Sequence, residues 1–339
     1  MSGRAARLTA ERARTILVML AAAFVVSIVA AAMIGGVRLS FVRALDFSHP
    51  DEPDFVIFFR TRVPRVLLGA VVGGGLAAAG AALQALLRNP LASPDVIGIT
   101  GGASIGAIFV LAFGASGPAW ILVPGAAFAA SLATLAAILR LSTVHGRLNP
   151  YSLLLVGVIV NTVAAAAIMM VTALVDSLRA QGVLVWLTGT LSQRPYPLVA
   201  LVTALTVAPT MVLWKNARSL NLLALGEEAA TQLGADVARV RRASFLAAAL
   251  IVGAAVSVSG IIGFVGLIVP HCLRLAVGSD QRLLVPASFL AGGIFLVLAD
   301  ALARTVVAPT EIPVGVLTAL CGGPFFIFLL RRQEEGRGL

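Results

Sequence analysis

The sequence predicts an all-α, polytopic membrane protein that forms a single transmembrane domain over residues 1–339. Composition is the first reason: 59% of the residues are hydrophobic, 12% are charged and the mean hydropathy is +1.01, far above that of soluble domains. The second reason is a series of about ten apolar runs, most of them long enough to cross a hydrocarbon core as a helix. The net charge of +10 does not indicate nucleic-acid binding, because the arginines are spread between these runs without interleaved aromatic residues.

Proline, glycine and charged residues separate the apolar runs and set the expected boundaries of the spans. The expected spans are residues 15–36, 64–87, 95–113, 118–140, 151–175, 196–214, 239–259, 261–277, 283–303 and 312–331. The first has an apolar core of roughly 20 residues, longer than the roughly 7–15 of a signal peptide, so we expect it to remain as a span. The eighth is short and rich in glycine, which predicts a broken or half-crossing helix buried in protein or lining a cavity.

The second span and the bend that follows it organise the rest of the chain. Small residues recur at helical spacing along this span, at Gly69, Gly73, Ala77 and Gly80, so another helix can approach one of its faces closely. Prolines in the bend, residues 88–95, end the helix because proline lacks a backbone donor and biases the preceding residue away from helical dihedrals. A tightly packed helical hairpin is the minimal interpretation of this region.

The basic residues predict the orientation of the chain in the membrane. With ten crossings and an internal amino terminus, roughly two thirds of the 25 Lys and Arg residues fall on the internal side. Because cytoplasmic segments carry the excess of positive charge, we expect both termini to be cytoplasmic. The hydrophilic residues 38–62 then lie outside and residues 215–242 lie inside.

The sequence lacks the residues needed for an energy-coupling reaction of its own. A phosphate-binding loop needs a lysine after a glycine-rich turn, and the only lysine, Lys215, follows Trp214, which excludes ATP hydrolysis in this chain. The sequence contains no HExxH motif, and Cys272 and Cys321 lack metal-ligand spacing. We therefore expect no catalytic residue, no metal and no cofactor in this chain.

Asp300 is the clearest ionisable residue within an expected span, and Arg304 lies four residues later on the same helix face. Two interpretations are open. An intramembrane carboxylate can relay protons in a secondary transporter that works alone. It can equally form an ion pair with Arg304 near the end of the helix.

The internal segment 219–242 predicts two short amphipathic helices, broken at Gly226 and Gly234. Its acidic residues, Glu227, Glu228 and Asp236, stand where a helix start favours negative charge. Helices too short to span suit the docking of a soluble partner on the cytoplasmic face. They can also simply lie on the bilayer surface.

Arginines gather on the external side at the mouth of the second span, at Arg60, Arg62 and Arg65. Such a cluster can anchor a helix end by extending its side chains to the membrane surface. It can alternatively meet acidic groups of a partner protein, where charges at the rim of an interface set association rate and register. Both interpretations remain open from the residues alone.

Six motifs occur in a fixed order along the chain. They are RVPR at 62–65, GAALQALLRNPLASPDVIGITGGASIGA at 80–107, LGEEAATQLGADVARVRR at 225–242, SVSGIIGFVGLIVPHCLRLAVGSDQRLLVP at 257–286, LADALART at 298–305 and EIPVGVLTALCGGPFFIFLL at 311–330. Together they resemble the permease family of ATP-driven importers for iron chelates, haem and cobalamin, the type II ABC importers. The resemblance covers residues 62–332 and implies ten helices per subunit.

The resemblance also implies partners and site residues. The partners are two ATP-binding cassette subunits that hold ATP and Mg, a periplasmic or lipid-anchored substrate-binding protein, and a second permease subunit, with a homodimer expected. In similar permeases the positions of Arg62, Arg65 and Arg304 receive acidic residues of the binding protein, and those of Asn89 and Leu91 match the cytoplasmic narrowing of the path. The coupling helices, within residues 219–238, correspond here to Leu225, Gly226, Glu227, Glu228, Leu233 and Gly234. Residues 176–195 are expected as a loop without a ligand that identifies the cargo.

These observations predict a non-catalytic permease subunit of an ATP-driven, binding-protein-dependent importer in the bacterial inner membrane. An iron chelate, preferably a ferric siderophore, is the expected cargo, with haem and cobalamin as alternatives. The rival function is a secondary transporter or channel working alone, which would not need segment 219–242. An intramembrane enzyme is a weaker third option, because no nucleophile and base pair is evident.

Overall fold

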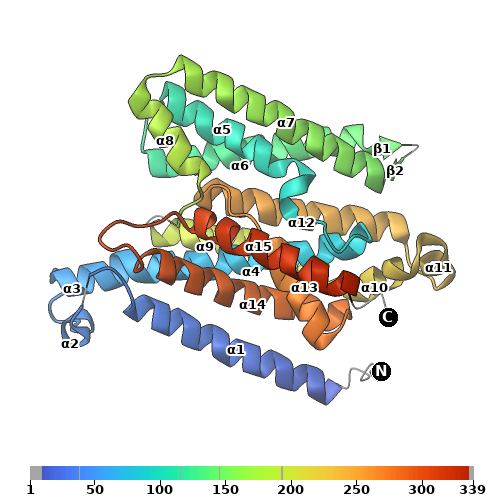
Figure 1. The fold of residues 1–339 in the computed structure, drawn as a ribbon, viewed down its shortest axis with the longest axis horizontal. Helices are drawn as coiled ribbons and strands as arrows, with labels where there is room; N and C mark the ends of the chain where they lie inside the picture. Colours follow the sequence, from blue (N-terminus) through green and yellow to red (C-terminus); the bar gives the residue numbers. More distant parts are fainter. Residues whose placement is uncertain (1–9, 38, 115, 145, 192–193, 336–339) are drawn as a thin grey trace.

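The computed structural model describes residues 10–37, 39–114, 116–144, 146–191 and 194–335, which form a bundle of helices (Figure 1). Seven helices in the described chain are long and apolar enough to cross a membrane. Three further apolar helical stretches are shorter: Ile99–Phe113, Val265–Val277 and Val314–Ile327. Each of the ten expected spans thus contains an apolar helix, and the prediction of an all-α polytopic membrane protein is confirmed.

The ten helices that match the expected spans are α1 (Ala10–Met33), α4 (Val63–Leu86), α5 (Ile99–Phe113), α6 (Ala119–Leu141), α7 (Pro150–Leu174), α9 (Tyr196–Lys215), α12 (Val237–Ser259), α13 (Val265–Val277), α14 (Gln281–Ala303) and α15 (Val314–Glu335). The elements that connect them are α2 (Phe41–Ala44), α3 (Pro53–Val56), the π-helix η1 (Ile57–Arg62), the 3-10 helix η2 (Pro94–Ile97), the paired strands β1 (Thr143–Val144) and β2 (Arg147–Leu148), α8 (Ser177–Leu187), α10 (Ala217–Leu225) and α11 (Glu227–Gln232).

Helix α4 lies at the centre of the bundle and continues α3 and η1 as one helical segment, Pro53–Leu86. It is the most buried of the seven candidate spans, with 89% of its most apolar window inside the protein. A Cβ atom at Gly73 would overlap the carbonyl of Gly292 in α14, and one at Gly80 would overlap the carbonyl of Gly266 in α13. The close-packing face expected from the spacing of small residues is therefore present.

The eighth expected span is a half-length helix, as predicted. The chain between α12 and α13, residues 260–264, is not helical. Phe264 takes a left-handed backbone conformation (φ 69°), which is costly for a residue with a side chain. Pro94 of the bend packs against Gly266 at the start of α13. Within this stretch Gly260 and Ile262 are buried and the other three residues are half-buried, so protein covers much of the irregular backbone.

Helix α1 lies on the outside of the bundle and is anchored at its carboxyl-terminal half (Figure 1). Its buried residues are Ser27, Ala31 and Ala32, and the two alanines pack with Ala70 of α4 and Val297 of α14. Only 17% of its most apolar window is buried. The amino-terminal half of α1 therefore has few contacts with the bundle.

Helices α5, α6, α7 and α8 form the other side of the bundle, in the upper part of Figure 1. Only 11% of the most apolar window of α7 is buried. Large exposed apolar side chains follow its length: Leu155, Val158, Ile159, Val163, Met169, Met170 and Leu174. In a membrane protein, such a face meets lipid or another subunit.

Part of the segment expected as a loop, residues 176–195, is the helix α8. Asp176 caps this helix, and its Oδ1 accepts a hydrogen bond from the backbone N–H of Arg179 at 3.0 Å. The Arg179 guanidinium donates to the carbonyl of Ala112 at the end of α5, at 2.7 Å. The loop prediction was wrong here because it gave no weight to this capping aspartate.

Candidate functional site

The predicted site residues lie at the two ends of α4. The first group, the arginine cluster, consists of Arg62, Arg65 and Arg304 with Asp300. The second group lies at the opposite end and comprises the bend after α4 and the coupling segment, which is α10 and α11 with the residues up to 238.

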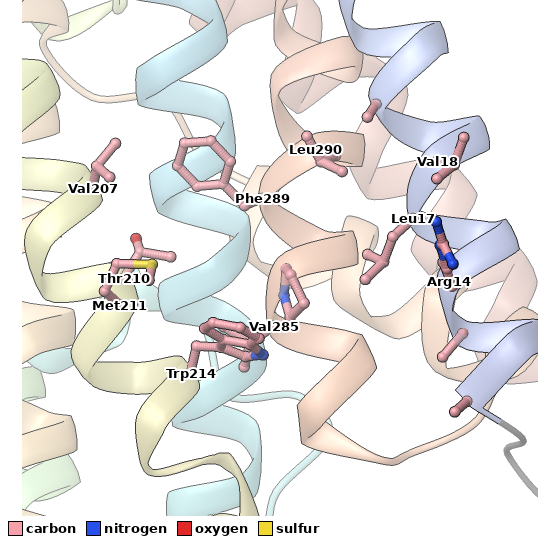
Figure 2. Close-up of a pocket in the computed structure, with 14 residues that line it drawn as sticks. Arg14, Leu17, Val18, Val207, Thr210, Met211, Trp214, Val285, Phe289 and Leu290 are labelled. Carbon is pink, nitrogen blue, oxygen red and sulfur yellow. The ribbon is translucent and has the colours of Figure 1, made fainter.

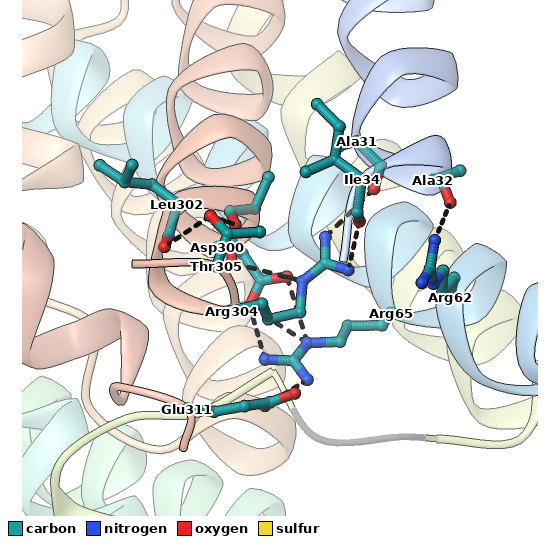
Figure 3. Close-up of polar contacts among 11 residues, drawn as sticks. Ala31, Ala32, Ile34, Arg62, Arg65, Asp300, Leu302, Arg304, Thr305 and Glu311 are labelled. Carbon is teal, nitrogen blue, oxygen red and sulfur yellow. Dashed lines mark hydrogen bonds and ion pairs between the residues drawn. The ribbon is translucent and has the colours of Figure 1, made fainter. Parts of the chain in front are cut away.

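Asp300 is the centre of the arginine cluster (Figure 3). Its carboxylate accepts hydrogen bonds from Arg65 Nε at 3.1 Å and Nη2 at 3.0 Å, and forms an ion pair with Arg304 Nε at 3.0 Å. Asp300 is 1% exposed. The ion pair between Asp300 and Arg304 expected from their spacing is present, and the geometry favours this interpretation of Asp300 over a proton relay.

Arg62 and Arg304 are both buried, and their guanidinium groups hold the end of α1. Arg304 donates to the carbonyls of Ile34 at 3.1 Å and Ala31 at 3.2 Å, while Arg62 donates to those of Met33 at 3.0 Å and Val37. Helix ends leave carbonyl groups without helical partners, and arginines satisfy such groups well. These two side chains therefore have a structural role, whatever else they bind.

Arg65 is the member of the cluster that reaches toward the surface. Its Nη1 donates to Glu311 Oε2 at 2.7 Å, and the Glu311 side chain is 52% exposed. Arg62, Arg65, Arg304 and Glu311 line a pocket of 210 Å³ that also involves Gly35. Three guanidinium groups and one carboxylate thus line this pocket, so its lining keeps a net positive charge.

The bend after α4 is shaped by Asn89. The Asn89 side-chain oxygen accepts from the backbone N–H of Leu91 at 2.9 Å, and its carbonyl accepts from Ala92 at 3.1 Å. Arg88 has a left-handed backbone conformation (φ 49°). Leu91 is 45% exposed. The two residues expected at the cytoplasmic narrowing therefore differ, because Asn89 shapes the turn while Leu91 projects from it.

The coupling segment folds as the two short helices that the sequence predicts. Helix α10 ends at Gly226 (φ 126°), and Gly234 (φ 82°) follows α11. Leu225 and Leu233 are 70% and 62% exposed, while Leu223 is buried. Exposed leucines beside buried ones leave an apolar surface available to a partner.

Glu227, the first residue of α11, connects the coupling segment to α12 and to the bend. Its carboxylate accepts a hydrogen bond from Arg241 of α12 and lies 3.6 Å from Arg88 Nη2 in the bend. Arg241 also donates to the carbonyl of Leu148 in β2 at 3.0 Å. Glu228, the neighbouring acidic residue, is exposed. Glu227 is therefore positioned to transmit a displacement of α11 to α12 and to the bend.

A second polar contact joins α10 to the start of α14. The Asn221 amide donates to Asp280 Oδ1 at 2.8 Å, and its oxygen accepts from the backbone N–H of Gln281 at 2.8 Å. The hydrogen bonds from Arg282 lower the pKa of Asp280 to about 2, and the bond from Asn221 acts in the same direction. The Asp280 carboxylate in this contact is therefore charged at neutral pH.

Sequence analysis did not single out Arg88, Arg241 and Asp280 as site residues. Arg241 is 6% exposed. In the sequence, Arg241 stands in an amphipathic stretch among other charged residues. That pattern does not reveal which of the neighbouring arginines is buried. Arg60, grouped with the external arginines in the sequence, is exposed on η1. Within the described residues no group of three or more His, Cys, Asp or Glu side chains could hold a metal ion.

The chain matches a known family and several known proteins over most of its length. Residues 20–332 match the model of the FecCD transport family. The chain is 41% identical to the hemin transport system permease protein of Yersinia pestis (90% of this chain, 92% of the relative) and 42% identical to the cobalamin import system permease protein of Halobacterium salinarum (87% and 79%). It is 38% identical to the Fe(3+) dicitrate transport system permease protein of Escherichia coli (83% and 86%).

The structure also resembles a solved one. A putative metal-chelate type ABC transporter in an inward-facing conformation superposes with a TM-score of 0.82 at 29% identity, covering 94% of this chain and 99% of that chain. The sequence and structural similarities therefore extend over the same nearly complete length.

Proposed function

The chain belongs to the FecCD transport family, and on that premise we propose that it is the permease subunit of an ATP-driven importer whose cargo is a ferric siderophore. It is an ABC importer permease of the iron-chelate, haem and cobalamin type. Haem and cobalamin remain the alternative cargoes, since permeases named for hemin, cobalamin and ferric dicitrate share between 38% and 42% identity with it.

The observation that carries this proposal is the connection of Glu227 with Arg88 and Arg241. A coupling segment that presents leucines to a partner and is ion-paired to the bend is what a permease driven by a separate ATPase requires. We place two ATP-binding cassette subunits, holding ATP and Mg, on this segment. The permease itself performs no catalysis. Movement of the ATPases displaces α11, and Glu227 passes that displacement to the bend at Asn89 and Leu91.

On the external face, we propose that the arginine cluster receives a carboxylate of the substrate-binding protein. The guanidinium groups of Arg62 and Arg304 are hydrogen-bonded to the end of α1, so they provide positive charge at fixed positions. Arg65 is paired with the exposed Glu311, and an acidic residue of the binding protein would replace that carboxylate. Charge pairs at an interface rim govern mainly the association rate and the register of docking.

A second copy of the chain is our proposal for the partner that covers the exposed face of α7. The cargo path then runs between two permease subunits. We further propose a bacterial inner-membrane location with both termini in the cytoplasm, based on the excess of basic residues in the expected internal segments. A secondary transporter working alone is not supported by a specific observation, because the carboxylate of Asp300 is bonded to two arginines.

The test is affinity purification of the intact chain from its native membrane in mild detergent. The proposal predicts that a P-loop ATPase and a second permease copy are recovered, and that deletion of 219–234 removes the ATPase while the permease stays folded. Reconstituted complex with binding protein is then supplied with ferric siderophore, haem or cobalamin. ATP-dependent uptake of siderophore alone supports the cargo assignment. A folded chain that comes out alone and moves solute without ATP contradicts the proposed function.

A further inference from the structure

An apolar groove of 790 Å³ lies between α1, α9 and α14, near the amino-terminal end of α1 (Figure 2). Leu17 and Ala21 of α1 form one wall and Met211 and Trp214 of α9 the other, with Phe289 of α14 between them. The volume falls within the roughly 300–1,000 Å³ typical of sites for small molecules. The groove is separate from the two groups of site residues, because it shares no residue with the arginine cluster or the coupling segment.

The groove lies beside the half of α1 that contributes no fully buried residue to the bundle. The buried residues of α1, Ser27, Ala31 and Ala32, all belong to the carboxyl-terminal half, where small side chains allow close approach to α4 and α14. The amino-terminal half has no such contact surface and stands away from α9. An empty apolar space of this size would forfeit the dispersion contacts of its lining, so an apolar molecule is expected to fill it.

The polar groups in the lining indicate what kind of molecule fits. Thr210 donates to the carbonyl of Thr206 at 2.7 Å, and Trp214 Nε1 donates to the carbonyl of Arg282 at 3.0 Å, so both are satisfied within the protein. Arg14 lines the groove on α1 and is exposed. Figure 2 shows its guanidinium on the side of α1 that carries Leu17 and Val18. An apolar groove with a cation beside it is complementary to an anionic amphiphile.

We propose that this groove binds one anionic phospholipid, with an acyl chain along Leu17, Met211 and Phe289 and the phosphate headgroup paired with Arg14. Lys215, which directly follows Trp214 in the last turn of α9, adds a second positive charge at the same end of the helices. Anionic lipid headgroups attract such basic residues at the membrane surface. The bound lipid holds the amino-terminal half of α1 against α9 and α14. The proposal is independent of cargo and of the ATPase.

The test measures which lipid stays bound to the purified protein. The intact chain is placed in nanodiscs with equal amounts of phosphatidylglycerol and phosphatidylcholine of identical acyl chains, transferred to mild detergent, and its retained lipids are counted by native mass spectrometry. We expect one phosphatidylglycerol per chain, retained at least about fivefold over phosphatidylcholine, since each basic residue near an anionic headgroup contributes about 1 kcal/mol. Arg14→Gln should reduce this preference, with Lys215 left as the remaining cation. Ala21→Trp, which fills the groove, should release the lipid.

Two matched variants serve as controls. Arg140→Gln removes an exposed arginine from the last turn of α6, across the bundle from α1, and Ala22→Trp adds the same bulk one residue outside the lining. Both should retain lipid as the unaltered chain does, and gel filtration of every variant checks that it is folded. Equal retention of the two lipids by the unaltered chain would overturn the proposal. So would an Arg14→Gln protein that matches Arg140→Gln, or an Ala21→Trp protein that matches Ala22→Trp.

Discussion

Arg65 and Asp300 are 235 residues apart in the sequence, yet three hydrogen bonds of 3.0–3.1 Å join their side chains between α4 and α14. The Asp300 carboxylate is shared with Arg304, whose guanidinium binds the end of α1. One carboxylate therefore ties three helices together at this end of the bundle. Removing this carboxylate would therefore weaken the packing of all three helices.

Asp300→Asn should destabilise the protein strongly. The substitution leaves Arg65 and Arg304 without their shared carboxylate in a buried site, and breaking a buried ion pair in this way typically costs about 3–5 kcal/mol. Thermal unfolding of the purified chain in detergent measures the loss. Glu311→Gln is the matched control, since that half-exposed carboxylate should cost at most about 1 kcal/mol. Similar unfolding curves for the two variants would contradict this account of the cluster.

Glu311→Gln should strengthen docking of the substrate-binding protein. The substitution removes the carboxylate that occupies Arg65, so the incoming acidic residue has one competitor fewer. The gain should be roughly two- to fivefold in affinity, in keeping with up to about 1 kcal/mol for an exposed pair. Biolayer interferometry with permease in nanodiscs measures it, and Asp51→Asn, at an exposed position between α2 and α3, is the control. Weaker binding by Glu311→Gln would show that Glu311 takes part in docking instead.

The fold was largely predictable, because the sequence pattern that identifies a membrane-spanning helix lies within the helix itself. Each expected span required only a run of apolar residues, and the pair of Asp300 with Arg304 required only a spacing of four residues. The contact of Arg65 with Asp300 could not be predicted, because no local pattern specifies which helix lies beside α4. The same limit applies to Arg62 and Arg304: the family resemblance assigned both to the docking of a binding protein, whereas their burial depends on where the end of α1 comes to lie.

In the candidate site, too, the local helix boundaries were predictable and the contacts between distant residues were not. Gly226 and Gly234 marked the boundaries of α10 and α11 correctly, because glycines with positive φ end short helices. The partner of Glu227 was not predictable, since Arg239, Arg241 and Arg242 stand close together in sequence and only packing selects one of them. Arg241 is the one that is buried, next to β2.

Gly80→Ala should destabilise the bundle, because the new methyl group would overlap the carbonyl of Gly266 in α13. Overpacking of this kind costs typically about 1–3 kcal/mol. Gly125→Ala in α6 is the matched control: nothing lies within 4 Å of the added Cβ, and alanine favours a helix by about 1 kcal/mol over glycine. Thermal unfolding of the two variants should therefore shift in opposite directions. A neutral Gly80→Ala variant would mean that α4 and α13 can separate at no cost.

Acid should weaken the contact between α10 and α14. The pKa of Asp280 is lowered from 3.8 to about 2, so the folded state favours the charged carboxylate. The stability it contributes is present above pH 3.8 and is lost as the pH falls toward 2. Thermal unfolding followed from pH 6 to pH 2 should fall more steeply below pH 4 for the unaltered chain than for Asp280→Asn. Parallel curves would rule out a contribution from this carboxylate.

Glu227→Gln should uncouple the ATPase from the permease without removing it. The amide cannot balance the charge of Arg241, and leaving a buried charged group poorly satisfied costs about 1–3 kcal/mol, which should loosen α11 from α12 and from the bend. The measurement is the stimulation of ATPase activity by cargo-loaded binding protein in reconstituted complexes. We expect stimulation to fall at least about fivefold, which corresponds to the lower end of that energy range.

Glu228→Gln is the control for this prediction, because Glu228 is the neighbouring carboxylate on the same helix but is exposed. It should keep normal stimulation if the effect of Glu227 depends on its pairing with Arg241 and Arg88. Co-purification separates docking from transmission: Glu227→Gln should still bring down the ATPase, since the exposed Leu225 and Leu233 are unchanged. If Glu227→Gln and Glu228→Gln both lost the ATPase, the two acidic residues would belong to the docking surface itself. The proposal that Glu227 transmits ATPase movement to α12 would then have no support.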